Sequence, residues 1–92
     1  MKQRQWVYIV QVGNDGPVKI GTAMDVAQRM SQLQWASVEL LHLRAVIPGG
    51  MDVEKRLHRE LSRHRLRGEW FQMCDEIGQI IATADAGDFP GK

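Results

Sequence analysis

Cysteine is nearly absent from this chain of 92 residues, which holds Cys74 and no other thiol. One cysteine excludes a disulfide framework within the chain and any zinc module built on several cysteines. Long hydrophobic runs are absent as well: no stretch approaches the ~20 apolar residues that cross a bilayer, and residues 1–5 lack the apolar segment of a signal peptide. We therefore expect a soluble protein without a membrane anchor that works in the cytoplasm.

The excess of proline and charge that is typical of disordered chains is also missing. There are 3 prolines, 25% of the residues are charged, and the net charge is +1. A chain of this length buries roughly 60–68% of its unfolded surface, which is enough for a single core without metal or disulfide cross-links. The sequence thus predicts one domain over residues 1–92, with its core at 6–86 and a frayed tail at 87–92.

Charge is unevenly distributed along the chain. Acidic residues outnumber basic ones after Met73, whereas the segment from Asp52 to Glu69 is rich in basic residues. These are Lys55, Arg56, Arg59, Arg63, Arg65 and Arg67. Guanidinium groups match phosphate oxygens well, so such a segment is typical of nucleic-acid binding. An exposed helix face with local ion pairs explains the same residues equally well, and charge alone does not decide between the two.

The expected elements follow the order β-β-α-β-α-α, which indicates an α+β fold with a small three-stranded antiparallel sheet flanked by helices. β-branched and aromatic residues mark the strands, and apolar residues at helical spacing mark the helices. Asp25 is the expected cap of the first helix. The expected strands are 6–12, 18–21 and 38–47, and the expected helices are 26–34, 51–65 and 75–84.

The apolar residues of each element predict the face that it buries. In the third strand, alternation predicts a single buried face. In the first two helices, the spacing predicts one stripe each. The strand face is Leu41, Leu43, Ala45 and Ile47; the helix stripes are Val26, Met30 and Leu33 in the first helix and Val53, Leu57 and Leu61 in the second.

Polar side chains that could take part in catalysis or ligand binding are expected along one rim of this sheet. Tyr8 and Lys19 share a face of the first hairpin and are diagonal neighbours if its loop has an even number of residues. Arg29 borders the apolar stripe of the first helix. Glu54 borders the stripe of the second helix, with His58 one turn further on. Taken singly, each has a plainer explanation as a half-buried packing residue or a surface charge.

The combined pattern resembles the GIY-YIG nuclease superfamily. In that family a strand with a tyrosine precedes a strand that ends in isoleucine-glycine, an arginine follows on the first helix, and a glutamate follows on a later helix. The matching positions are Val7-Tyr8-Ile9, Lys19-Ile20-Gly21, Arg29 and Glu54. The later stretch Arg67-Gly68-Glu69-Trp70-Phe71 is similar to a short branch of the superfamily from bacteria and phages, whose members are often labelled DNA-binding domains.

This chain differs from the family pattern at several positions. Trp6-Val7-Tyr8 stands where the family has glycine-isoleucine-tyrosine, and Lys19 stands where it has its second motif tyrosine. An expected histidine is missing near Leu33, and an asparagine found late in many members is replaced within residues 69–71. These differences concern the catalytic groups more than the fold.

The resemblance implies a role in phosphodiester hydrolysis for each matched residue. Glu54 would hold one divalent metal ion, Mg²⁺ or Mn²⁺, with waters completing its coordination. Tyr8 would accept a proton from the attacking water, and Lys19 would favour the phenolate that this requires. Arg29 would brace the scissile phosphate, and His58 is a secondary catalytic candidate. The side chains of Arg56, Arg59, Arg63 and Arg65 would contact the DNA backbone without reading its sequence.

Three functions stay open at this point. The first is a metal-dependent DNA endonuclease. The second is a DNA-binding module with the same fold and no turnover, whose affinity would fall steeply with salt. The third is a protein-interaction module, marked by a large exposed apolar patch near Trp35. Because a core of this size has no room for a second module that reads bases, any target preference must come from DNA structure, a protein partner or a homodimer.

Overall fold

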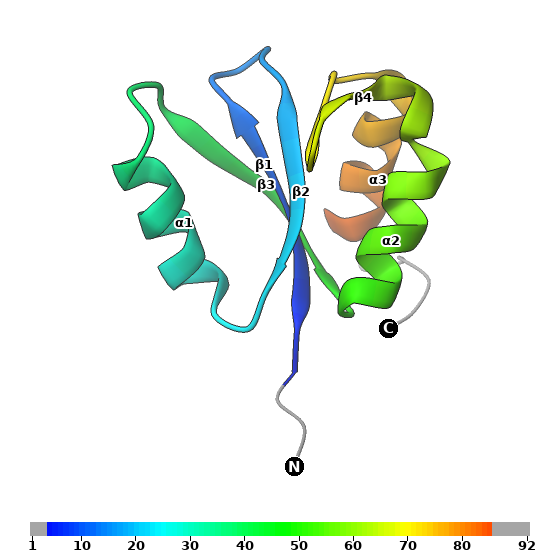
Figure 1. The fold of residues 1–92 in the computed structure, drawn as a ribbon, viewed down its shortest axis with the longest axis horizontal. Coiled ribbons are helices and arrows are strands. Elements are labelled where there is room, and N and C mark those ends of the chain that lie inside the picture. The colour runs from blue at the N-terminus through cyan, green and yellow to red at the C-terminus, as the bar shows by residue number, and fades with distance from the viewer. Residues whose placement is uncertain (1–3, 86–92) are drawn as a thin grey trace.

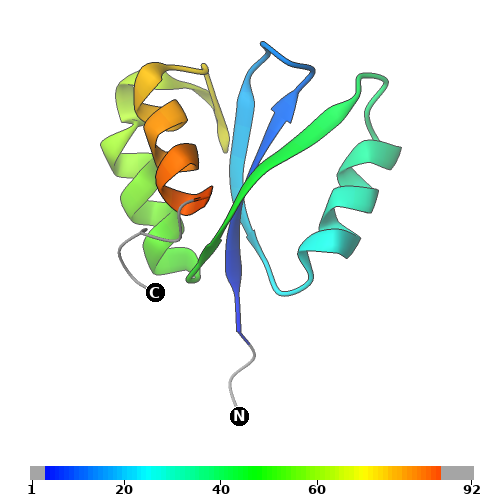
Figure 2. The same cartoon turned by 180° about the vertical axis from the view of Figure 1, so that it is seen from behind.

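The computed structural model describes residues 4–85, so the tail expected at 87–92 lies outside the described residues. The elements follow the chain in the order β1 (Trp6–Val12), β2 (Val18–Ala23), α1 (Val26–Trp35), β3 (Leu41–Pro48), α2 (Met51–Glu60), the short 3₁₀ helix η1 (Ser62–His64), β4 (Arg65–Arg67), β5 (Trp70–Phe71) and α3 (Asp75–Asp85). One helix, α1, covers one face of the sheet, and α2 and α3 cover the other (Figure 1). The reverse view shows the same three layers (Figure 2). Within the described range, none of the helices has the length and apolar character that crossing a membrane requires.

All strand pairings are antiparallel, and the strand order is β3-β1-β2-β5-β4. The expected α+β class is confirmed. The expected three-stranded sheet was wrong, because within residues 4–85 β4 and β5 extend it to five strands. These two strands contain three and two residues, which is too few for an alternating pattern to be recognised in the sequence.

Helix α2 ends at Glu60, several residues earlier than expected. Its predicted stripe of Val53, Leu57 and Leu61 is buried. The next position of the stripe is Arg65, whose charge cannot be buried without a partner, so the helix has no further apolar contact to gain beyond Leu61. The chain therefore turns through η1 into β4 instead of continuing as a helix.

The first hairpin has the predicted register. Tyr8 lies opposite Gly21 and Val10 lies opposite Lys19, so Tyr8 and Lys19 are diagonal neighbours on one face. The loop turns through Gly13 at a φ of 60°, a conformation that L side chains rarely adopt. Strand β1 lies between β2 and β3, so both of its edges are paired, and its residues 7–11 are buried on both faces of the sheet.

Strand β3 does not keep the single apolar face that its alternation predicts. Its pairing with β1 shifts at a bulge around Arg44, and beyond a bulge the alternation of faces is out of step. Ala45 and Ile47 pack in the core beneath α2 and α3, whereas Leu41 packs on the α1 side and Leu43 is 43% exposed. The prediction of one shared face was therefore wrong.

Two cores of unequal size lie on the two faces of the sheet. The core beneath α1 is small, and α1 contributes no fully buried residue to it. Asp25 caps this helix as predicted, accepting a hydrogen bond of 3.0 Å from the Gln28 amide. Under α1 lie Tyr8, Val10 and Ala23, packed against Val26, Met30, Leu33 and Leu41. Under α2 and α3 lie Val7, Ile9, Val18, Ile20, Ala45, Ile47, Val53, Leu57, Leu61, Phe71 and Ile77.

Candidate functional site

The candidate site forms at the outer edge of β2. The short strand β5 pairs with β2 only at Val18 and Lys19, so beyond Ile20 this edge has no neighbouring strand within residues 4–85. Helix α2 lies near the same edge, on the face of the sheet opposite to α1. Side chains from the two faces can therefore meet at this edge. We call this group, formed by Tyr8, Lys19, Arg29, Glu54 and Glu69, the β2 edge site.

The hydroxyl of Tyr8 is the innermost group of the site. Tyr8 is fully buried, and its hydroxyl has no hydrogen-bond partner of good geometry among residues 4–85, although the Arg29 guanidinium is near enough to interact with it. Gly21 leaves the space that the hydroxyl occupies, because a Cβ there would lie 2.6 Å from Tyr8 Oη and 2.9 Å from Glu69 Oε1. Gly21, the glycine of the second motif, is therefore needed on steric grounds, because a larger residue would collide with the Tyr8 hydroxyl. A buried hydroxyl without a partner costs free energy, which favours a ligand as the missing partner.

Glu69, at the turn between β4 and β5, joins the site although the sequence did not single it out. Its Oε1 lies 3.0 Å from Lys19 Nζ, and the lysine side chain is only 17% exposed. The ammonium also lies 5.7 Å from the centroid of the Trp70 ring. Glu69 is part of the glycine-glutamate-tryptophan-phenylalanine ending that carried the family resemblance, so that motif was the signal that could have identified it.

The charged neighbours of Tyr8 have opposite effects on the pKa of its phenol. Burial raises the pKa of Tyr8 above its ordinary value, and the positive charges of Lys19 and Arg29 work against this rise. The negative charge of Glu69 adds to it. Arg29 is exposed on α1, so its guanidinium can reach solvent as well as the phenol. Tyr8 is therefore protonated at neutral pH, with two cations beside it that stabilise the phenolate once it forms.

Glu54 is a buried carboxylate, with 8% of its surface exposed. Burial and the negative charge of Glu69 raise its pKa, whereas His58 and the Thr22 hydroxyl lower it. Thr22 was not among the predicted site residues, and nothing in its surroundings along the chain distinguishes it. Two neighbouring carboxylates are oxygen donors of the type that a hard divalent cation prefers.

His58, on α2, contacts strands β2 and β5 beside the site. Its Nε2 lies 2.9 Å from the carbonyl oxygen of Ile20 and 3.9 Å from Glu54 Oε1. Its ring centroid lies 5.0 Å from that of Phe71. A protonated Nε2 donates to the Ile20 carbonyl and ties α2 to β2, which is a positioning role. The catalytic role expected of His58 stays a prediction.

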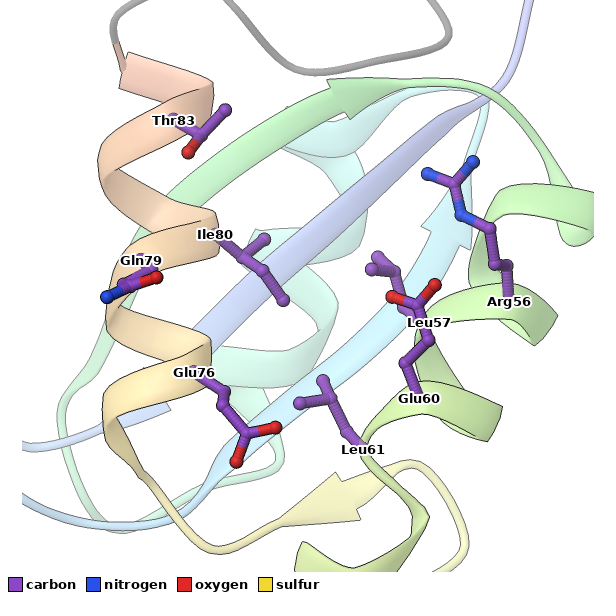
Figure 3. A pocket seen from close by; sticks show the side chains of 8 residues that line it. All are labelled: Arg56, Leu57, Glu60, Leu61, Glu76, Gln79, Ile80 and Thr83. Atoms are coloured by element: carbon purple, nitrogen blue, oxygen red, sulfur yellow. The ribbon is translucent and has the colours of Figure 1, made fainter.

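The four arginines expected at the DNA backbone do not form one continuous surface. Arg63 Nη2 donates to Glu76 Oε1 on α3 at 2.9 Å. Arg56 lines an open groove of about 490 Å³ between α2 and α3 (Figure 3). Arg59 and Arg65 are exposed, on α2 and β4. The groove and the β2 edge site therefore lie on different sides of α2.

Helical geometry explains this separation. Arg56 follows Glu54 by two positions, which places it about 200° further around the helix axis. Glu54 and His58 consequently face β2, whereas Arg56 faces α3. The buried side chains of Leu57 and Leu61 lie between these two flanks of α2 and form part of the groove wall.

Comparison with known proteins gives one family match. A family model described as the T5orf172 domain matches residues 5–86. The match extends over every element from β1 to α3. No curated protein and no solved structure shows significant similarity to the chain.

Proposed function

The chain belongs to the T5orf172 domain family, a phage-derived domain related to the GIY-YIG nuclease fold, and from that premise we propose that it is a metal-dependent DNA endonuclease. The observation that carries the proposal is the β2 edge site. There, a buried phenol lies near the cationic side chains of Lys19 and Arg29 and near the Glu69 carboxylate, and Glu69 in turn is a neighbour of Glu54. Perturbed acidic groups of this kind, gathered at an edge, are typical of sites that transfer protons.

The donor set of the site suits a divalent metal ion. Glu54 and Glu69 are neighbouring carboxylates, and Lys19 pairs with Glu69. Glu54 would hold Mg²⁺ or Mn²⁺, with Glu69 as a second oxygen donor beside it. When bound, the ion would polarise the phosphate and offset its charge as a Lewis acid.

The side chains of the protein supply the remaining functions. The phenolate of Tyr8 accepts a proton from the attacking water and becomes the neutral phenol, and the charges of Lys19 and Arg29 lower the cost of forming that phenolate beforehand. Arg29 braces a non-bridging phosphate oxygen with its fork of donors. Because burial raises the pKa of Tyr8, the fraction able to accept a proton grows with pH. We expect the cleavage rate to increase from about pH 7 to about pH 9.

Contacts with the DNA backbone are divided among the predicted arginines. Arg59 and Arg65 have no ion-pair partner within residues 4–85, whereas Arg63 is paired with Glu76. Arg59 and Arg65 are therefore the first choice for phosphate contacts, and replacing either with glutamine should weaken binding equally for all DNA sequences.

Cleavage of supercoiled plasmid in Mg²⁺ or Mn²⁺ tests the proposal. We expect metal-dependent nicking that falls about 10²–10⁴-fold in Tyr8→Phe, which loses the proton acceptor, and that is abolished in Glu54→Gln. Glu60→Gln is the matched control, because Glu60 lies on the same helix but lines the groove between α2 and α3. Nicking that survives both site variants would contradict the proposal.

A second candidate is DNA binding without turnover. The ion pair of Lys19 with Glu69 favours it, since the carboxylate neutralises a cation that the phenolate needs. This candidate predicts tight binding that weakens steeply with salt, no nicking in any metal, and the same affinity in Glu54→Gln as in the unmodified protein.

Exposed apolar residues at the end of α1 and just after it support a role for a protein partner or a second copy. Trp35 is 94% exposed, Val38 is fully exposed and Leu40 is 64% exposed. Neighbouring large apolar side chains at this exposure are typical of contact surfaces. Sedimentation equilibrium with and without Trp35→Ser tests self-association, and a monomer at all concentrations would leave only the partner.

A further inference from the structure

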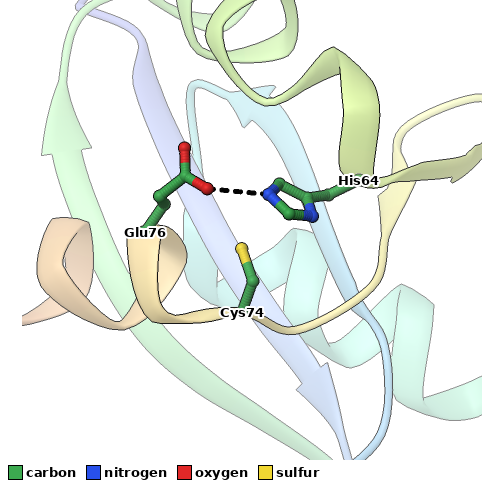
Figure 4. A group of neighbouring side chains, drawn as sticks. All are labelled: His64, Cys74 and Glu76. Carbon is green, nitrogen blue, oxygen red and sulfur yellow. Dashed lines mark hydrogen bonds and ion pairs between the residues drawn. The ribbon is translucent and has the colours of Figure 1, made fainter.

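A second cluster of metal-binding side chains contains no residue of the β2 edge site. His64 ends η1, Cys74 immediately precedes α3, and Glu76 lies in the first turn of α3. Their ligand atoms all lie within 4.8 Å of one another, and His64 Nε2 is 2.8 Å from Glu76 Oε1. The three side chains point into the same space (Figure 4).

The backbone holds these residues in place. The Gln72 amide donates to the His64 carbonyl at 2.8 Å, which fixes the two ends of the β4–β5 hairpin against each other. The Gly78 amide donates to the Cys74 carbonyl at 3.0 Å, which fixes Cys74 at the start of α3. The ligand atoms therefore sit on a frame that is already ordered, so binding an ion costs little conformational entropy.

We propose that His64, Cys74 and Glu76 form a binding site for a divalent transition-metal ion, with Zn²⁺ as the ion that their donors suit best. Imidazole nitrogen, thiolate sulfur and carboxylate oxygen are the three donor types of protein zinc sites. Zinc bond lengths of 2.0–2.3 Å place tetrahedral ligands about 3.3–3.7 Å apart. Small side-chain rotations would bring the ligand atoms, which lie within 4.8 Å of one another, to that spacing, and a water would complete the four ligands.

The guanidinium of Arg63 already occupies the place of a cation in this cluster. Its Nη2 lies 2.9 Å from Glu76 Oε1, and its Nε donates to His64 Nε2 at 3.2 Å. One positive group thus contacts two of the three ligands. The Arg63 side chain is 75% exposed, so it can swing into solvent when a metal ion binds. Arg63 is consequently a competitor of the metal rather than a ligand.

A bound ion would fasten the β4–β5 hairpin to α3. His64 precedes the hairpin and Cys74 follows it, so the ion closes the segment that carries Glu69 into the β2 edge site. A small domain gains stability from such a cross-link. The role of the ion is structural, and it does not depend on the nuclease proposal.

Zn²⁺ titration of the metal-free protein by calorimetry tests the site, with Co²⁺ absorption as a second readout. We expect one ion per chain and a thiolate-to-cobalt charge-transfer band, because sulfur is a ligand. Cys74→Ser and His64→Asn should each bind at least about tenfold more weakly. His42→Asn is the matched control, since His42 lies on β3 outside the cluster, and it should bind as the unmodified protein does.

Arg63→Gln gives the sharpest outcome. Removing the competing cation should tighten Zn²⁺ binding by about two- to fivefold, the range expected for an exposed ion pair. Saturating Zn²⁺ should also raise the melting temperature of the unmodified protein but not that of Cys74→Ser. The proposal is overturned if the cobalt band is absent, or if Zn²⁺ affinity is unchanged in Cys74→Ser. It is equally overturned if affinity falls only in Glu54→Gln, because the ion would then occupy the β2 edge site.

Discussion

The two faces of the sheet differ in whether their buried polar groups form hydrogen bonds. Strand β1 contributes side chains to both faces, because successive residues point to opposite sides. Gln11, on the face toward α2 and α3, is 3% exposed and fully satisfied: its Nε2 donates to the Gly16 carbonyl and its Oε1 accepts from Arg44, each at 2.9 Å. Tyr8, on the face toward α1, is equally buried but its hydroxyl has no partner within residues 4–85. The same strand thus carries one polar group used for structure and one left available.

Packing follows the same division. The face beneath α2 and α3 is closed by side chains such as Leu57, which is 1% exposed, whereas α1 contributes only partly buried residues to the other face. Free energy of folding comes mainly from buried apolar area. We infer that the closed face stabilises the domain and that the face under α1 tolerates the unsatisfied hydroxyl that the proposed chemistry needs.

A matched pair of leucine substitutions tests this division most strongly. Leu57→Ala on α2 should lower the free energy of unfolding by roughly 2–5 kcal/mol, because it leaves a cavity in a closed core. Leu33→Ala on α1 removes the same atoms from a partly buried position and should cost about 1 kcal/mol. Urea denaturation measures both. Equal losses in the two variants would show that the faces share the stability evenly.

A smaller effect is expected from filling the space beside the phenol. Gly21→Ala places a Cβ 2.6 Å from Tyr8 Oη and should cost about 1–3 kcal/mol through overpacking. Tyr8→Phe in the same chain removes the oxygen and should restore part of the loss, which a double-mutant cycle measures. Gly78→Ala is the control: its Cβ meets nothing closer than 3.9 Å, so in α3 it should stabilise by about 0.5–1 kcal/mol. Additive costs in the cycle would mean that Gly21 has another steric role.

Those features that depend on local spacing could be predicted from the sequence. Alternation and the glycine-rich turn predicted the diagonal pair of Tyr8 and Lys19, and the stripe of α2 follows from its helical spacing. Each of these patterns is complete within about ten residues, so no distant contact is needed to read it.

The features that depend on tertiary contact could not be predicted. The bulge at Arg44 is set by how β3 meets β1, and no residue type marks it. Glu69 enters the β2 edge site because β5 pairs with β2. A strand of two residues is too short for this pairing to be recognised in the sequence. His64 and Cys74 lie ten positions apart and meet only because the β4–β5 hairpin brings its ends together.

Replacing the buried Glu54 carboxylate with a neutral amide should stabilise the fold near neutral pH, whereas most substitutions of buried residues destabilise it. Burial and Glu69 raise the pKa of Glu54, so the folded protein holds this proton more tightly than the unfolded chain does, and stability falls as pH rises through that range. Glu54→Gln lacks this fall. The two proteins should be equally stable below about pH 4, and near pH 7 the variant should be more stable by at most about 1 kcal/mol. Thermal unfolding across pH measures the difference, and a variant that is less stable at pH 7 would mean that Glu54 is satisfied in the fold.

The smallest expected effect on stability is the most informative about the face beneath α1. Tyr8→Phe removes a hydroxyl that, within residues 4–85, has no hydrogen bond of good geometry and only the exposed Arg29 guanidinium as a polar neighbour that favours its phenolate through a side-chain contact, so the free energy of unfolding should stay unchanged or rise by less than about 1 kcal/mol. On the closed face, Gln11→Leu should lower stability by about 1–3 kcal/mol, because the Gly16 carbonyl and Arg44 each lose a partner. Chemical denaturation of the two variants compares them directly. A large loss in Tyr8→Phe would show that the hydroxyl stabilises the fold, and it would then be unavailable to accept a proton.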